Sequence, residues 1–187
     1  MDIYYLNLHN VDKDLLKSVS SRTDMLIREN KIELKFLQHL AGRFLLDYVA
    51  KKIYCVEDTA LILRNGKPVF ENSPLNFSIS HSENIVTLMI SEFPIGIDIE
   101  YNVRERDFVK LVSRFNKVMG EKFQGLSFEQ QKKEFYQFWT QYEAKIKLGN
   151  VNSEVFLYST VLDNDFTLGI ATTSSISDFC MKKWGEF

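Results

Sequence analysis

The chain has 187 residues, which fits one large domain or two small lobes with room for a sizeable apolar core. A hydrophobic content of 45% with 26% charged residues is typical of a globular protein in water, and a net charge of −2 does not favour nucleic acid as a partner. No stretch approaches ~18 uninterrupted apolar residues, so no membrane-spanning helix is expected.

The two cysteines, Cys55 and Cys180, have neither the spacing of a zinc site nor the pattern of a disulfide framework. We therefore expect both thiols to be buried as small apolar side chains. Residues 1–5 lack the basic start and the apolar run of a signal peptide. We expect a cytoplasmic protein that binds no membrane and no nucleic acid.

The N-terminal part is predicted to contain a strand over residues 3–8 and a helix over residues 12–19 that begins at Asp12. A long helix is predicted from about residue 32 to residue 52. Its apolar side chains form one stripe at helical spacing: Phe36, Leu37, Leu40, Phe44, Leu45, Tyr48 and Val49. Arg43 lies in this helix, and taken alone it is an ordinary solvated arginine.

A β-hairpin is predicted over residues 60–70 around the turn Asn65-Gly66-Lys67-Pro68, because Asn-Gly is a strong turn sequence. This turn leaves Lys67 at an exposed bend, where a lysine usually has no specific role. Strands are then predicted over residues 77–82 and 85–90. The first of them, Phe-Ser-Ile-Ser-His-Ser, can donate several hydrogen bonds to an anion, although His81 taken alone is more often a structural histidine.

The strand over residues 94–100 carries two acids, Asp98 and Glu100, on one face, because side chains alternate along a strand. Its isoleucines at 95, 97 and 99 then point into a core. Two carboxylates one pleat apart repel each other, and a hard cation with oxygen ligands would relieve that cost. Taken alone, these residues also fit a strand with one solvated face, which antiparallel sheets often have.

The second half is predicted to contain a helix over residues 107–115, a loop or broken helix over 120–130, and a strong helix over 129–148 that Gly149 ends. The apolar side chains of the last helix are expected in the core: Phe135, Phe138, Trp139, Tyr142 and Ile146. A hairpin over residues 155–172 follows, and the tail shows no further motif.

Glu143 and Lys147 lie four residues apart, so they share one helical face at the border of this stripe. From a border position the two side chains can face a cleft between elements. They fit equally well an ordinary surface ion pair, which contributes only about a few tenths of a kcal/mol.

Four segments in order carry a more specific pattern: Gly-Lys-Pro (66–68), Phe-Ser-Ile-Ser-His-Ser (77–82), Gly-Ile-Asp-Ile-Glu (96–100) and Phe-Trp-Thr-x-x-Glu-Ala-x-x-Lys (138–147). Together they resemble the 4′-phosphopantetheinyl transferases of the surfactin-synthetase-activator (Sfp) type, over residues 41–149. The resemblance implies Mg²⁺-dependent transfer of 4′-phosphopantetheine from coenzyme A to a serine hydroxyl of an apo acyl or peptidyl carrier protein, with release of 3′,5′-ADP.

The resemblance also implies a fold. It is an α+β fold with pseudo-twofold symmetry, in which a single domain over residues 1–187 is made of two similar lobes, about 1–93 and 94–187. Each lobe is a small sheet packed on a long helix, and the protein is a monomer.

The resemblance assigns roles to the acids and to one lysine. Asp98 and Glu143 are implied to hold Mg²⁺, with Glu100 as a third ligand at a position where members of the family vary. Glu143 is also the candidate base for the serine hydroxyl. Lys147 is implied to steady charge on the phosphate or the leaving group.

Coenzyme A is implied to bind through four further residues. Ser80 and His81 match the family motif that contacts its phosphates, Lys67 matches a lysine near the nucleotide, and Arg43 matches an arginine on the same ligand. Arg28 and Lys31 align too loosely to be assigned.

Three positions depart from the family pattern. Tyr142 stands where many members have lysine, Ser78 where asparagine is common, and Val151 where a second glycine is frequent. Because a phenol carries no positive charge at neutral pH, a catalytically weak module that binds coenzyme A or a carrier protein is the alternative function. A metal-dependent phosphohydrolase would account for the acids alone. Apolar residues of the helix over 107–115 either contact the carrier or belong to the core: Phe108, Leu111 and Phe115.

Overall fold

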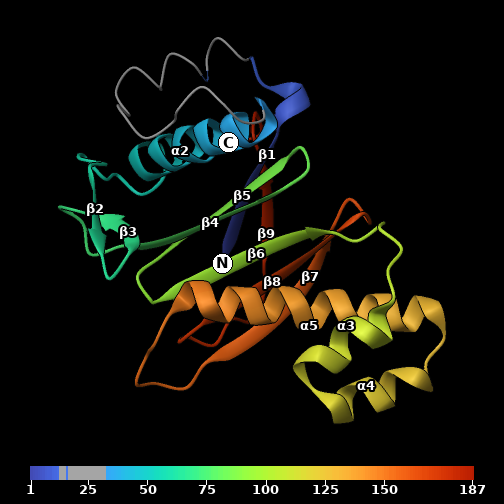
Figure 1. The fold of residues 1–187 in the computed structure, drawn as a ribbon. Coiled ribbons are helices and arrows are strands. Elements are labelled where there is room, and N and C mark those ends of the chain that lie inside the picture. The colour runs from blue at the N-terminus through green and yellow to red at the C-terminus, as the bar shows by residue number, and fades with distance from the viewer. Residues whose placement is uncertain (13–15, 17–32) are drawn as a thin grey trace.

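The computed structural model describes residues 1–12, 16 and 33–187 (Figure 1). The predicted helix over residues 12–19, apart from residues 12 and 16, lies outside the described residues, as do Arg28 and Lys31. The described strands are β1 (Asp2–Asn7), β2 (Leu61–Arg64), β3 (Lys67–Phe70), β4 (Asn76–Ser82), β5 (Ile85–Ser91), β6 (Ile95–Tyr101), β7 (Phe156–Leu162), β8 (Phe166–Thr172) and β9 (Cys180–Lys183). The described helices are the 3₁₀ turn η1 (Leu8–Asn10), α2 (Glu33–Lys52), α3 (Phe108–Phe115), α4 (Lys117–Gln124) and α5 (Phe128–Leu148).

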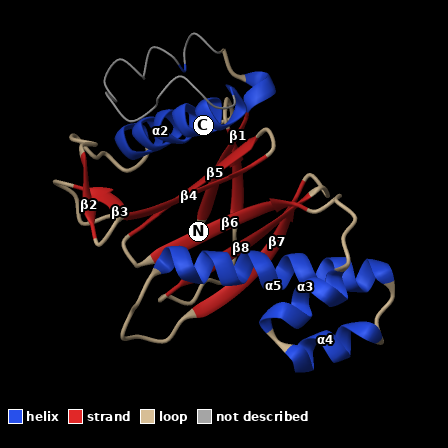
Figure 2. Cartoon of the chain, in the orientation of Figure 1, coloured by secondary structure: helices blue, strands red, loops and turns tan. Residues whose placement is uncertain are grey.

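Two long helices each cover a small sheet (Figures 1 and 2). Helix α2 packs on a four-stranded sheet with the order β4-β5-β1-β9, and α5 packs on a three-stranded sheet with the order β6-β8-β7. The predicted α+β fold with two helix-on-sheet units is confirmed. No helix in the described part of the chain is both long and apolar enough to cross a membrane.

The C-terminal end joins the first sheet. Strand β9 pairs in parallel with β1, and Trp184 and Phe187 pack by edge contacts against Tyr4, Phe44 or Tyr48. The predicted boundary between the lobes near residue 93 stays a prediction. Strand β9 belongs to the sheet of the N-terminal half, although its residues come after this boundary.

The two sheets share an apolar core. Ile95, Ile97 and Ile99 are at most 1% exposed and pack with Ile3 and Met89 of the first sheet. The predicted alternation of β6 is therefore confirmed, and Asp98 and Glu100 lie on the opposite face. This face is turned toward β4 and α5.

Helix α5 approaches its sheet so closely that two strand positions have room only for glycine. A Cβ atom at Gly96 would lie 2.0 Å from the carbonyl oxygen of Ala144, and one at Gly169 would lie 2.1 Å from the carbonyl carbon of Thr140. Gly96 is in β6, and Gly169 in β8 is the strand partner of Asp98. The contact places the backbone of α5 directly over the acidic strand.

This close contact explains why the predicted core stripe of α5 is partly wrong. Phe135 is buried, but Tyr142 is 41% exposed and Ile146 is 56% exposed. Only small side chains, Thr140 and Ala144, fit between the helix and the glycines. Phe138 and Trp139 are half-buried, and the buried Phe135 packs with Phe108 and Val112 of α3.

The predicted loop or broken helix over residues 120–130 is a broken helix: α4 extends to Gln124, and α5 begins at Phe128 behind a capping box formed by Ser127 and Gln130. The prediction that both cysteines are buried is wrong. Cys55 and Cys180 are exposed rather than buried, because Cys55 follows α2 in a turn and Cys180 begins the edge strand β9.

The predicted hairpin forms, but its turn contains only two residues. Asn65 and Gly66 both have positive φ angles, 53° and 77°, as a type I′ turn requires. Arg64 is then the strand partner of Lys67. Lys67 begins β3 and is half-buried, so the expectation that it lies at an exposed bend is wrong.

We expect Gly169→Ala to destabilise the fold by about 1–3 kcal/mol or more, because the new methyl group meets backbone that cannot move without displacing α5. Urea unfolding measures the change. Gly125→Ala is the control, since a Cβ there meets only one atom within 4 Å, at 3.6 Å, and its effect should be small. Equal stabilities of the two variants would contradict the close contact.

Candidate functional site

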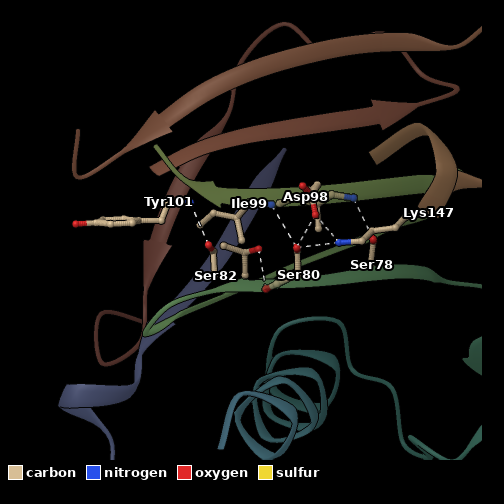
Figure 3. A network of polar contacts seen from close by, with 9 residues as sticks. Ser78, Ser80, Ser82, Asp98, Ile99, Tyr101 and Lys147 are labelled. Carbon is tan, nitrogen blue, oxygen red and sulfur yellow. Dashed lines mark hydrogen bonds and ion pairs between the residues drawn. The ribbon is translucent and has the colours of Figure 1, made fainter. Parts of the chain in front are cut away.

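Strands β4 and β6 lie in different sheets and are joined by serine side chains (Figure 3). The bonds run from Ile97 N to Ser78 Oγ (3.0 Å), from Ile99 N to Ser80 Oγ (3.2 Å) and from Tyr101 N to Ser82 Oγ (3.0 Å). Residue numbers rise together along both strands, so the strands run parallel. Hydroxyl groups thus replace the carbonyl acceptors of an ordinary sheet, each contributing about 0.5–1.5 kcal/mol. We call this row of bonds the serine seam.

Asp98 lies at the middle of the serine seam and is only 7% exposed. Its Oδ1 accepts hydrogen bonds from Ser80 Oγ at 2.9 Å and from Lys147 Nζ at 2.7 Å, and Lys147 Nζ also donates to Ser80 Oγ at 2.8 Å (Figure 3). The three groups form a closed triangle. The other oxygen, Oδ2, is buried and accepts no hydrogen bond from any described residue.

Glu100 is half-buried beside Asp98 on the same strand face. Burial raises the pKa of the Glu100 carboxyl, and the negative charge of Asp98 raises it further. Three smaller effects lower this pKa without cancelling the increase: the positive charge of Arg106, a hydrogen bond from Trp139 and the positive charge of Arg104. The carboxyl of Glu100 therefore needs a positive partner more than an ordinary surface acid does.

A hard cation fits this pair of acids. The unpartnered Oδ2 of Asp98 offers a free carboxylate oxygen, and Glu100 supplies a second carboxylate. Protein sites commonly hold Mg²⁺ through one or two carboxylates, with substrate phosphates as further ligands. Within residues 1–12, 16 and 33–187, no three His, Cys, Asp or Glu side chains are grouped closely enough to hold a metal, so the structure does not bring Glu143 into one cluster with Asp98 and Glu100.

A pocket of about 1440 Å³ opens beside the serine seam. It lies between α2, the β2–β3 hairpin, β4 and the C-terminal end of α5. Four basic side chains line it: Arg43, Arg64, Lys67 and Lys147. None of the described residues that line it is acidic, so the pocket favours an anionic ligand.

Two of these cations, Arg43 and Lys67, donate hydrogen bonds to backbone oxygens. Arg43 Nη2 donates to the carbonyl of Thr59 at 2.7 Å and pairs with Asp47 at 3.0 Å. Lys67 Nζ donates to the carbonyl of Lys147 at 2.8 Å, and burial lowers the pKa of Lys67. Because the last carbonyls of a helix lack partners within the helix, Lys67 joins the hairpin to the end of α5.

The two residues of the Ser-His motif occupy different places. The His81 side chain is exposed at the mouth of the pocket, where partial loss of solvent lowers its pKa and the charge of Lys147 lowers it further. Ser80 is buried in the serine seam and is not among the residues that line the pocket. Its predicted contact with coenzyme A stays a prediction.

Sequence reasoning missed Arg64, which lines the pocket from the end of β2. The Asn-Gly turn could have indicated it, because a two-residue turn makes Arg64 the strand partner of Lys67.

Solvent exposure distinguishes the two roles predicted for the apolar residues of the helix over 107–115, core packing and contact with a carrier. Phe108 is 1% exposed and belongs to the core, whereas Phe115 is 51% exposed.

Comparisons with known proteins identify relatives of one kind. No family model matches the chain. The chain is 31% identical over 116 residues to 4′-phosphopantetheinyl transferase psf-1 of Bacillus pumilus, covering 58% of this chain and 48% of that protein. It is 32% identical over 148 residues to 4′-phosphopantetheinyl transferase HetI of Nostoc sp., covering 72% and 61%.

A third relative decides the family. Over 134 residues the chain is 31% identical to 4′-phosphopantetheinyl transferase AcpT of Salmonella typhimurium, covering 70% of this chain and 67% of that protein. The chain belongs to the 4′-phosphopantetheinyl transferases. It spans about half to two thirds of the length of these relatives. The resemblance to this family predicted from the motifs is confirmed.

In this 4′-phosphopantetheinyl transferase family member, we expect the ionised carboxyl of Glu100 to lower stability at neutral pH. Since its folded-state pKa is raised, stability from this group is present below the unfolded pKa and is lost as pH rises through the folded pKa. Glu100→Gln should therefore unfold at higher urea than wild type at pH 7 in EDTA. The difference should shrink below about pH 4.

The control is Glu134→Gln, an exposed acid earlier on α5, which should leave stability unchanged at either pH. A Glu100→Gln variant less stable than wild type at pH 7 would show that the ionised carboxyl stabilises the fold, contrary to this account.

Proposed function

We propose that the chain transfers the 4′-phosphopantetheine group from coenzyme A to a serine hydroxyl of an apo acyl or peptidyl carrier protein and releases 3′,5′-ADP. The proposal includes Mg²⁺ as the cofactor and a monomer that acts in the cytoplasm. The observation that carries it is the position of Lys147, which lines the acid-free pocket and contacts Asp98. One side chain thus connects an anion-binding pocket with a buried acid. The names of the three relatives agree with this activity.

Coenzyme A carries several phosphate groups, and cations are the partners that such groups need. We assign them to the residues on the pocket wall: Arg43, Arg64, Lys67 and His81. A planar guanidinium can bind phosphate through two parallel hydrogen bonds, so the two arginines suit this role. His81 contributes a hydrogen-bond donor at the pocket mouth.

Asp98 and Glu100 would hold Mg²⁺, with Glu143 as the further ligand that the family resemblance implies. When bound, the ion neutralises charge on the pyrophosphate oxygens. The unpartnered Oδ2 of Asp98 supports the assignment. Lys147 adds a second positive charge on the pocket side of Asp98.

The transfer step exchanges one P–O bond for another. The serine oxygen of the carrier forms a bond to the β-phosphorus, and the bond from that phosphorus to the bridging oxygen breaks, which releases 3′,5′-ADP. Glu143, half-buried on α5 one turn before Lys147, is the base that we assign to the serine proton, directly or through a water. Lys147 steadies the charge on the phosphate or the leaving group.

A second candidate is a catalytically weak module that binds coenzyme A or a carrier protein. Tyr142 favours it, because its side chain is 41% exposed and does not fill the core as its place in the apolar stripe predicts. The ammonium group expected at this position from the family resemblance is replaced by a neutral phenol.

Mass spectrometry of apo carriers separates these functions. A panel of fatty-acid, polyketide and peptide-synthetase carriers is incubated with the protein, coenzyme A and Mg²⁺. The proposal expects at least one carrier to gain one phosphopantetheine. Tight binding of coenzyme A without a gain on any carrier would support the module, and breakdown of coenzyme A without a carrier would indicate a phosphohydrolase.

We expect Asp98→Ala to abolish transfer, since it removes the buried carboxylate that pairs with Lys147. Glu100→Ala should be milder, because Asp98 remains. Partners one shell away from a metal already contribute about 10–100-fold, so the loss at Asp98 should exceed about 100-fold. Near-normal Mg²⁺-dependent transfer by Asp98→Ala, measured beside Glu134→Ala as the control, would refute the ligand assignment.

Arg64→Gln tests the pocket assignment that the motifs did not provide. Loss of a hydrogen bond to a charged group costs about 1.5–3 kcal/mol, so the KM for coenzyme A should rise about tenfold or more with little change in kcat. Lys133→Gln removes an exposed cation near the start of α5, outside the pocket, and should leave KM unchanged. Equal KM values for both variants would remove Arg64 from the site.

A further inference from the structure

The three serines of β4 make the same bond to β6, yet only one of them touches the acid and the lysine. Ser78, Ser80 and Ser82 each accept one backbone N–H of β6. Ser80 alone also contacts the side chains of Asp98 and Lys147. Ser78 and Ser82 can therefore serve as matched controls for the additional contacts of Ser80.

The hydroxyl of Ser80 has no capacity left for a ligand. A serine hydroxyl has one donor and two acceptor lone pairs. In Ser80 the donor goes to Asp98 Oδ1 at 2.9 Å, and the lone pairs accept Ile99 N at 3.2 Å and Lys147 Nζ at 2.8 Å. The residue is only 5% exposed, so a phosphate oxygen could bind its hydroxyl only by displacing Asp98.

We propose that Ser80 is a positioning residue that fixes the Asp98 carboxylate and the Lys147 ammonium relative to each other, and that it does not bind coenzyme A through its hydroxyl. The effect of Ser80 on catalysis rests on the proposed transfer function. Its effect on the relative position of Asp98 and Lys147 is independent of that function.

The geometry explains how Ser80 acts on two elements at once. It is itself anchored from the neighbouring strand, since Thr87 Oγ1 of β5 donates to the Ser80 carbonyl at 3.2 Å. Its hydroxyl then reaches Asp98 on β6 and Lys147 on α5. Holding Oδ1 fixes the rotation of the carboxylate and thereby the direction in which Oδ2 points. A misplacement of about 1 Å in such a site can cost about 10²-fold in rate.

The kinetic test separates positioning from ligand binding. In Ser80→Ala we expect kcat to fall about tenfold or more and the KM for Mg²⁺ to rise, while the KM for coenzyme A stays within about twofold. Ser82→Ala loses the same kind of backbone bond and should leave all three parameters near wild type. A rise in the KM for coenzyme A as the main effect of Ser80→Ala would overturn the proposal.

A second test needs no activity. A double-mutant cycle of Asp98→Asn and Lys147→Met, followed by urea unfolding, measures the coupling between the two side chains. We expect this coupling to fall by about half or more in a Ser80→Ala background. It should persist in a Ser78→Ala background, because Ser78 is equally buried and bonds to the same strand. Unchanged coupling without the Ser80 hydroxyl would overturn the proposal.

Two further variants test whether the loss of coupling comes from the missing hydroxyl or from misfolding. Ser80→Cys leaves no cavity and has only a weak hydrogen-bonding group, so it should fold and still lose coupling, whereas Ser80→Thr keeps the hydroxyl and should keep the coupling. If the wild type modifies no carrier, the transfer function fails. The unfolding cycle then still decides the role of Ser80.

Discussion

The close contact between α5 and the strands beneath it is the constraint on which the site depends. Gly96 and Gly169 leave no room for side chains, so the helix backbone lies directly on β6 and β8. Helix α5 thereby carries Lys147 to Asp98 at 2.7 Å, across a sequence separation that no local pattern spans. The same contact leaves space only for Thr140 and Ala144 on the inner face of the helix. Trp139 lies beside this inner face, half-buried, and makes an edge contact with Phe115.

The charges on the two sides of Lys147 are arranged differently. On the pocket side, cations gather without any acid among the described lining residues. On the seam side, Asp98 keeps one carboxylate oxygen without a partner, next to a second acid at Glu100. A ligand that combines phosphate groups with a hard cation complements both sides together. Lys67 links the β2–β3 hairpin to this arrangement, because its ammonium donates a hydrogen bond to the carbonyl of Lys147.

Local patterns predicted those parts of the molecule that depend on neighbours in sequence. Alternation on β6 put Asp98 and Glu100 on one face, and the ordered motifs identified the family. Packing distances between elements are not encoded in periodicity, so the buried face of α5 was misassigned at Tyr142 and Ile146. The pairing of β9 with β1 was not predicted, because the two strands lie at opposite ends of the sequence. The predicted turn over residues 65–68 leaves Lys67 outside the strand, and so it hides the pairing of Lys67 with Arg64.

The most direct test of the central claim is a crystal structure of the chain with coenzyme A and Mn²⁺, with anomalous differences locating the ion. The account predicts an anomalous peak beside Oδ2 of Asp98 and the Glu100 carboxylate. It also predicts phosphate groups of coenzyme A within reach of Arg64, Lys67 and Lys147 in the pocket. An ion bound away from Asp98, or coenzyme A bound outside the pocket, would contradict it.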